Sequence, residues 1–250
     1  TSLQTLNLTA CAKLVSLPDI GNLKALTKLN LSHCDQLKSL PERLGECESL
    51  TFLDLEGCIS LQSLPDRFGE CKSLTSLNLR ECKSLVSLPD SIGDLTSLTE
   101  LYLYGCESLA SLPERFGELD LKKLLLERCK ALNMDAEINK IMEMKNLTEL
   151  DMGEYISVLP ERIGDLTLLK DLSLYNCESL VSLPERIGDL TSLTELNLME
   201  CTNLVSLPER FGELKSLKKL HMFDCPAGEN MPEALRAQLK NQGCEGNGWE

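Results

Sequence analysis

The sequence of 250 residues has few of the residue types from which catalytic and metal sites are built. It contains only two histidines, His33 and His221, one tryptophan and 4% aromatic residues. The histidines belong to distant parts of the chain, so no Cys–His or Ser–His pair is expected. No C-x-x-C, H-x-x-x-H or G-x-G-x-x-G run occurs, which argues against a zinc or dinucleotide site. We therefore expect a non-enzymatic protein with no cofactor and no bound metal.

Basic charge and long apolar runs are also scarce. Lys and Arg number 25 against 39 Asp and Glu, so the formal charge is -14 and the chain repels the phosphates of nucleic acid. No apolar run approaches the roughly 18–20 residues that cross a bilayer, so no membrane partner is expected. The chain starts at Thr1 and enters a repeat directly, without a polar cap, and we expect it to be cut from a longer protein.

A repeated unit dominates the sequence, and residues 73–96 show it most clearly. The pattern reads S-L-x-x-L-x-L-x-x-C-x-x-L-x-S-L-P-x-x-I/F-G-x-L-x. Ten copies begin near Ser2, Ala25, Ser49, Ser73, Ser97, Asp120, Asn146, Leu168, Ser192 and Ser216. A period of roughly 20–29 residues with L-x-x-L-x-L-x-x-N/C is the signature of a leucine-rich repeat. We predict an α/β leucine-rich-repeat solenoid (horseshoe) with a concave parallel β-sheet and a C-terminal helical cap.

Each part of the repeat predicts a local structure. The L-x-x-L-x-L segment is expected to form a short strand whose leucines face the core, leaving positions 4, 6 and 8 on the concave face. The Leu-Pro pair ends regular pairing and begins an extended segment. A short 3₁₀ turn then leads to a glycine, where we expect a positive φ. Phe68, Phe116 and Phe211 stand in this turn and are predicted to be core residues.

Twelve cysteines would favour a disulfide scaffold if their placement were ignored. Nine of them share position 10 of the repeat: Cys11, Cys34, Cys58, Cys82, Cys106, Cys129, Cys177, Cys201 and Cys225. Stacked, equivalent side chains point the same way, so bridging them would require local twisting. We predict a ladder of free, buried thiols, which favours a reducing compartment.

The pattern breaks at the sixth and seventh repeats and again at the C-terminus. Residues 135–144 predict a helix, and Tyr155 replaces the ladder cysteine. A longer convex helix with a tightened turn and a local kink or partner-specific bulge both explain this break. We assign residues 1–228 to the solenoid, 229–243 to a capping helix and 244–250 to a flexible tail. A free partner helix is the alternative for the capping segment.

Two columns of opposite charge follow the turns. Arginines at the turn stand beside carboxylates that follow the glycine, as Arg186 and Asp189 illustrate. A solvated lattice of ion pairs is the simpler interpretation, and a cation site is the alternative.

The residues at positions 4, 6 and 8 are not needed by the solenoid and are the candidates for partner binding. Two groups stand out because they are aromatic or apolar on a predicted exposed face. The candidate residues are Tyr102, Tyr104 and Leu125 in one group, and Tyr175, Met199, His221 and Phe223 in the other. Tolerated surface residues would show the same pattern, so both interpretations stay open.

The phrase C-x-x-L-x-x-L-P-x-x-I-G-x-L, plain within Leu169–Leu190 and Leu193–Leu214, carries a resemblance. It resembles the leucine-rich-repeat domains of plant-type intracellular nucleotide-binding immune receptors over roughly residues 2–225, apart from the sixth and seventh repeats. It is also similar to intracellular Ras-group leucine-rich-repeat scaffolds. The first resemblance implies a cytosolic module that binds a protein ligand or restrains neighbouring domains.

We therefore expect a cytoplasmic, monomeric protein-recognition module that binds a protein partner of unknown identity on its concave face. Two alternatives remain: a scaffold or assembly module that uses the convex or lateral face, and an autoregulatory fragment of a larger protein.

Overall fold

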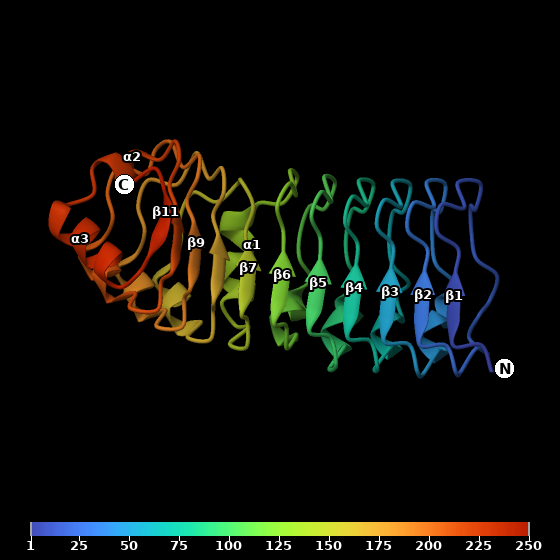
Figure 1. Ribbon diagram of the computed structural model, residues 1–250. Helices are drawn as coiled ribbons and strands as arrows, with labels where there is room; N and C mark the ends of the chain where they lie inside the picture. The colour runs from blue at the N-terminus through green and yellow to red at the C-terminus, as the bar shows by residue number, and fades with distance from the viewer. Residues whose placement is uncertain (1, 250) are drawn as a thin grey trace. The chain divides into compact units, whose positions relative to one another are not determined.

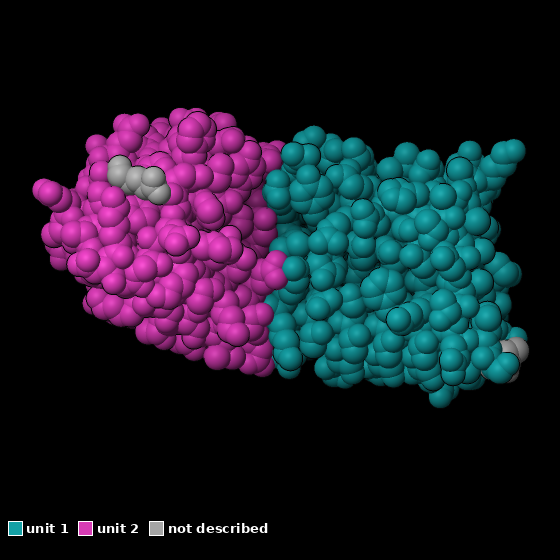
Figure 2. Space-filling view, in the orientation of Figure 1, with its two compact units in different colours: residues 1–133, 139–144 teal, residues 134–138, 145–250 magenta. Residues whose placement is uncertain are grey.

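The computed structural model describes residues 2–249, and the chain divides into two compact units (Figure 2). Unit 1 comprises residues 1–133 and 139–144, and unit 2 comprises residues 134–138 and 145–250. Each unit is an α/β leucine-rich-repeat solenoid in which short parallel strands alternate with loops and short helices (Figure 1). The predicted fold class is confirmed.

The strands follow one another in chain order, and each pairs in parallel with the next within its unit. In unit 1 they are β1 (Thr5–Asn7), β2 (Lys28–Asn30), β3 (Phe52–Asp54), β4 (Ser76–Asn78), β5 (Glu100–Tyr102) and β6 (Lys123–Leu125). In unit 2 they are β7 (Glu149–Asp151), β8 (Asp171–Ser173), β9 (Glu195–Asn197), β10 (Lys219–His221) and β11 (Glu245–Asn247).

The alternation of leucine and polar residues determines which face of each strand is buried. Leu53, Leu77 and Leu101 stand at the centres of adjacent strands, pair with one another in register and are 0% exposed. Burying each such side chain stabilises the fold by about 1.5–3 kcal/mol. The strand residues before and after the central leucine point to the opposite face, as the alternation of a strand requires. That face is therefore available for function.

Short 3₁₀ helices follow the Leu-Pro pairs, as predicted. They are η1 (Glu42–Glu46), η2 (Phe68–Glu70), η3 (Asp90–Asp94), η4 (Glu114–Glu118), η5 (Glu161–Asp165), η6 (Glu185–Asp189) and η7 (Glu209–Glu213). Most begin directly after the proline, whose fixed φ suits the residue before a helix. Phe68, Phe116 and Phe211 are 0% exposed, which confirms their prediction as core residues.

The role predicted for the turn glycines was wrong. Within residues 2–249, none of the glycines at this position has a positive φ. The left-handed conformation occurs instead one residue before the ladder cysteine, for example at Glu81 (φ 56°) and Arg128 (φ 61°). The turn glycines are required by close packing, because a Cβ at Gly93 would lie 2.7 Å from the carbonyl oxygen of Arg115 in the next repeat.

The ladder cysteines are free thiols, as predicted, and all except Cys11 are buried. Each typical thiol donates to a backbone carbonyl of the preceding repeat: Cys82 Sγ lies 3.2 Å from Leu55 O, and Cys106 Sγ lies 3.2 Å from Leu79 O. Burial raises the pKa of Cys58 to about 12. The ladder therefore joins successive layers through neutral thiols.

The two irregular repeats contain the predicted helix and a shifted turn. Helix α1 (Met134–Ile141) is present, and its residues are divided between the two units. In unit 2, Tyr155 is 42% exposed and the adjacent Ile156 is fully buried, so isoleucine fills the layer that cysteine fills elsewhere. The left-handed residue moves to Gly153, whose carbonyl oxygen accepts a hydrogen bond from Cys177 Sγ at 3.0 Å.

The C-terminal end contains two helices, α2 (Pro226–Glu229) and α3 (Glu233–Asn241). Helix α3 packs against η7, and Gln242 beyond it donates to the carbonyl oxygen of Leu214 at 3.0 Å. The predicted flexible tail at 244–250 was wrong for its described residues. Residues 245–247 form β11 and pair with β10, because the edge of β10 offers backbone partners. Trp249 is 3% exposed and its Nε1 donates to Leu220 O at 2.9 Å, while Glu250 lies outside the described residues.

Candidate functional site

The candidate site is the exposed face of the sheet, to which each repeat contributes one strand. Positions 4 and 6 of each repeat lie within a strand, and position 8 is the second residue after it. In β9, Glu195 and Asn197 are half-buried on this face while Leu196 between them is fully buried. Side chains at the same position of successive repeats therefore form rows that run across the strands, about 5 Å apart.

Three of the predicted residues form one continuous row in unit 2. Backbone hydrogen bonds extend the strand pairing to them: Asn176 N donates to Met199 O at 2.8 Å, and Glu200 N donates to Phe223 O at 2.9 Å. Tyr175, Met199 and Phe223 therefore stand on adjacent repeats, and we call them the apolar row. Tyr175 and Met199 are half-buried, whereas Phe223 is 61% exposed. A phenyl ring with that exposure offers apolar surface whose removal from water by a partner is favourable.

Polar partners fix the surroundings of the apolar row. The hydroxyl of Tyr175 donates to Glu200 Oε1 at 2.9 Å, which orients the ring. His221 is half-buried in β10, and its Nε2 lies 3.6 Å from a carboxylate oxygen of Glu195. Lys219 Nζ donates to the same carboxylate at 2.8 Å, and this hydrogen bond raises the pKa of Lys219. His221 thus belongs to a polar network beside the row and not to its apolar surface.

The predicted group in unit 1 is also brought together, but cations cover its rings. Tyr102 and Leu125 are register partners on β5 and β6. The guanidinium of Arg80 lies 4.1 Å from the centroid of the Tyr102 ring, and Lys123 Nζ lies 5.6 Å from it. Such cation–π contacts contribute about 0.5–1 kcal/mol each at exposed sites. Arg128 approaches Tyr104 in the same way at 5.4 Å. This group is therefore a mixed aromatic and cationic surface.

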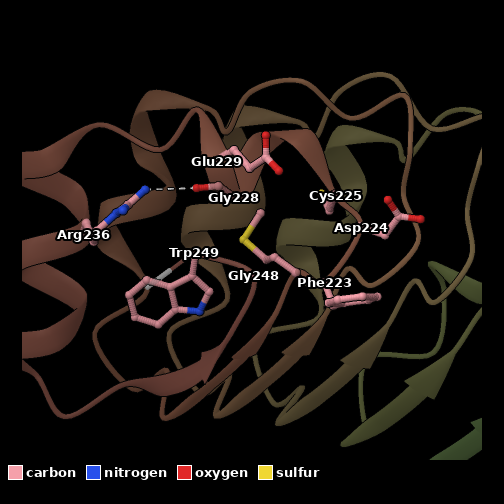
Figure 3. A pocket seen from close by; sticks show the side chains of 9 residues that line it. Phe223, Asp224, Cys225, Gly228, Glu229, Arg236, Gly248 and Trp249 are labelled. Carbon is pink, nitrogen blue, oxygen red and sulfur yellow. Dashed lines mark hydrogen bonds between the residues drawn. The ribbon is translucent and has the colours of Figure 1, made fainter.

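A cavity that the sequence did not indicate lies next to Phe223. Its volume is about 520 Å³, and residues from four segments line it: the segment after β10, helices α2 and α3, and the tail after β11. Figure 3 shows Phe223, Asp224, Glu229, Arg236 and Trp249 around it. Arg236 Nη2 donates to the carbonyl oxygen of Gly228 at 3.3 Å. Asp224 and Glu229 are both exposed, so two carboxylates stand at a partly aromatic cavity.

The two charged columns form ion pairs, as the simpler interpretation predicted. Arg210 pairs with Glu213 of its own turn at 2.8 Å and also with Asp189 of the preceding turn. Arg186 and Arg210 together hold the pKa of Asp189 below its ordinary value. Among residues 2–249, no cluster of three or more His, Cys, Asp or Glu side chains is arranged to hold a metal ion. None of the helices in that part of the chain is both long and apolar enough to cross a membrane.

The geometry defines a leucine-rich-repeat solenoid, and comparison with known proteins agrees. Residues 1–124 match the protein family described as a leucine-rich repeat region. A comparison with curated proteins found no match. The chain is also similar to several solved structures.

The leucine-rich repeat domain of the type III effector XopL is 24% identical, with a TM-score of 0.61, over 97% of this chain and 75% of that one. The Toll–Spatzle complex of Drosophila is 23% identical, with a TM-score of 0.63, over 88% of this chain and 33% of that one. The Arabidopsis receptor kinase HAESA, in complex with the peptide hormone IDA and the co-receptor SERK1, is 23% identical. Its TM-score is 0.55, over 88% of this chain and 43% of that one. These likenesses concern the fold alone.

Proposed function

We propose that this chain is a non-enzymatic recognition domain that binds a protein partner on the exposed face of its sheet. The observation that carries the proposal is the apolar row of unit 2, where Tyr175, Met199 and Phe223 are aligned and Phe223 is 61% exposed. Aromatic and methionine side chains are enriched in interfaces, and exposed contiguous groups of them mark interaction sites. The solenoid itself does not need these side chains, because its core is filled by the leucines of the other face.

Similar proteins support a recognition role. The solved structures of Toll and of HAESA are complexes, the first with Spatzle and the second with a peptide hormone and a co-receptor. The repeat phrase C-x-x-L-x-x-L-P-x-x-I-G-x-L, with its resemblance to intracellular immune receptors, supports the same role in the cytoplasm. The free thiol ladder supports a reducing compartment, since stacked cysteines persist unoxidised there.

A second candidate is a scaffold or assembly module that uses a different surface. One observation favours it: valines at position 14 of the repeat are exposed outside the sheet face. Val86 is 52% exposed in unit 1, and Val181 and Val205 are 59% and 55% exposed on adjacent repeats of unit 2. This surface offers a control for the apolar row, because Val181 and Val205 lie in the same unit and are about as exposed as Phe223.

Three baits would test the proposal in a quantitative capture experiment from native cytosolic extract: the parent chain, Tyr175→Ala/Met199→Ala/Phe223→Ala, and Val181→Ala/Val205→Ala. Circular dichroism and thermal unfolding would first verify that all three are folded. We expect the apolar-row variant to lose partners that the valine variant keeps. Loss with the valine variant alone would favour the scaffold role. Equal capture by all three would refute binding on the sheet face.

A further inference from the structure

The two units present faces of different charge. At positions 4, 6, 8 and 9 of the repeats, unit 1 contains five acidic and four basic residues, which nearly cancel. The acidic residues are Asp54, Glu56, Glu81, Glu100 and Glu127, and the basic residues are Lys28, Arg80, Lys123 and Arg128. At the same positions unit 2 contains seven acidic residues and Lys219 alone. They are Glu149, Asp151, Glu154, Asp171, Glu195, Glu200 and Asp224. The negative charge of the sheet face is therefore concentrated where the apolar row lies.

Acidic side chains stand on both sides of the apolar row. Asp171 and Glu195 precede it along β8 and β9, and Glu200 and Asp224 follow it at position 9. Lys219 offsets Glu195, and Glu200 accepts a hydrogen bond from Tyr175. A partner that covers the row must therefore bring positive charge beside its apolar groups, because like charges juxtaposed at an interface are strongly unfavourable.

The cavity next to Phe223 continues this arrangement. A lysine or arginine side chain could lay its alkyl stem against the exposed ring of Phe223 and place its charged end near Asp224 or Glu229, which line the cavity together with the buried Trp249 (Figure 3). A volume of about 520 Å³ is ample for one long side chain. Arg236, which donates to the carbonyl oxygen of Gly228, is the basic residue among those that line the cavity with Asp224 and Glu229.

We propose that the sheet face of unit 2 binds an extended, basic segment of a protein partner. Apolar side chains of that segment cover Tyr175, Met199 and Phe223, and a lysine or arginine enters the cavity at Asp224 and Glu229. The apolar row spans about 10 Å, which three to four residues of extended chain cover. The inference rests on the proposed function and adds the chemistry of the partner.

A random twelve-residue peptide library displayed on phage would test the inference without a known partner. The baits are the parent chain, the apolar-row triple alanine variant, Asp224→Asn/Glu229→Gln, and the control Glu42→Gln/Glu209→Gln. The control also removes two negative charges, but from exposed positions on η1 and η7 that lie away from the cavity. Recovered peptides are then synthesised with a fluorescent label and titrated by anisotropy at two salt concentrations.

We expect recovered peptides to combine lysine or arginine with apolar residues and to lose binding to the triple alanine variant. Asp224→Asn/Glu229→Gln should weaken them about fivefold, since two exposed charge pairs are lost, while the control changes little. Raising the salt should weaken binding further. The emission of Trp249, the single tryptophan, should change on binding because it lines the cavity.

The failures are distinguishable. Peptides that need the apolar row but carry no excess of basic residues would overturn the inference and leave the proposed function intact. Peptides that bind the triple alanine variant equally well would overturn both. Equal weakening by the two charge variants would show an effect of net charge and would overturn the cavity contact. Recovery of no peptide would overturn the basic segment as the ligand.

Discussion

Gly93 and Gly212 occupy the same position of the repeat, yet alanine should have opposite effects at the two. Both lie in 3₁₀ turns, η3 and η7, and neither has a positive φ. A Cβ at Gly93 would lie 2.7 Å from the carbonyl oxygen of Arg115 and 2.8 Å from its Cβ. A Cβ at Gly212 would meet the side-chain amide of Gln238 at 3.4 Å, an ordinary van der Waals contact. The difference arises because the turn of the next repeat packs against Gly93, whereas helix α3 packs against Gly212.

The two contacts predict that alanine lowers the free energy of unfolding at Gly93 and does not lower it at Gly212. Overpacking against a backbone that cannot easily move costs about 1–3 kcal/mol. Replacing glycine by alanine in a compatible conformation stabilises a protein by about 0.4–1 kcal/mol, because the unfolded chain loses freedom. Gly93→Ala should therefore lower the free energy of unfolding by about 1.3 kcal/mol, the difference between the middles of these two ranges. Gly212→Ala should leave it unchanged or raise it by up to about 1 kcal/mol.

Equilibrium unfolding in urea, followed by circular dichroism, would measure both variants against the parent chain. Repeat arrays can unfold in stages, so the slopes of the transitions should be compared before their midpoints. If both variants shift the midpoint by the same amount, close packing between turns does not explain the glycines. A Gly93→Ala variant as stable as the parent would refute the reasoning directly.

Three further predictions concern the core. Burial raises the pKa of Cys58 and Cys71 to about 12. Between the ordinary thiol pKa of 9.0 and that value, the folded state keeps protons that the unfolded state releases. The free energy of unfolding should thus be at its full value below pH 9 and fall towards pH 12, less steeply in alanine variants, as urea midpoints across that range would show. Trp249→Ala should cost about 3–5 kcal/mol and Trp249→Phe clearly less, whereas equal midpoints would mean a dispensable tail. Leu77→Ala should cost about 2–5 kcal/mol and the partly exposed Leu6→Ala less than half of that, and equal losses in urea unfolding would contradict the layered core.

The regular part of the fold was predictable because the same residue spacing recurs in successive repeats. The strand positions, the 3₁₀ turns and the thiol ladder follow from spacing alone, as Leu77, Phe68 and Cys82 illustrate. The left-handed residue before the cysteine was not predictable. Ala10, His33, Gly57, Glu81 and Arg128 share no side-chain property, because the conformation is imposed by backbone hydrogen bonds such as Glu81 N to Tyr104 O at 2.7 Å.

The candidate site was predictable in part. The register of the repeats places Tyr175, Met199 and Phe223 in one row. The same register pairs Tyr102 with Asn78, so the contact of Arg80 with the Tyr102 ring is diagonal and does not follow from the register. The cavity was not predictable, because four separate segments build it only after the chain has folded. Strand β11 was missed because the sequence Glu-Gly-Asn has little strand preference, and its pairing depends on the edge that β10 provides.

Identical residues at identical positions therefore do not have identical roles in this solenoid. The space available at Gly93 is limited by the turn of the next repeat, and the space at Gly212 is set by helix α3, which takes the place of that turn. The same reasoning applies to position 8, where Phe223 ends the apolar row. Its neighbours beyond the row are Trp249 and the cavity instead of another repeat. Because the template stops there, side chains that no repeat requires are brought together with Asp224 and Glu229. Departures from the template, and not the template itself, are where partner specificity is to be sought.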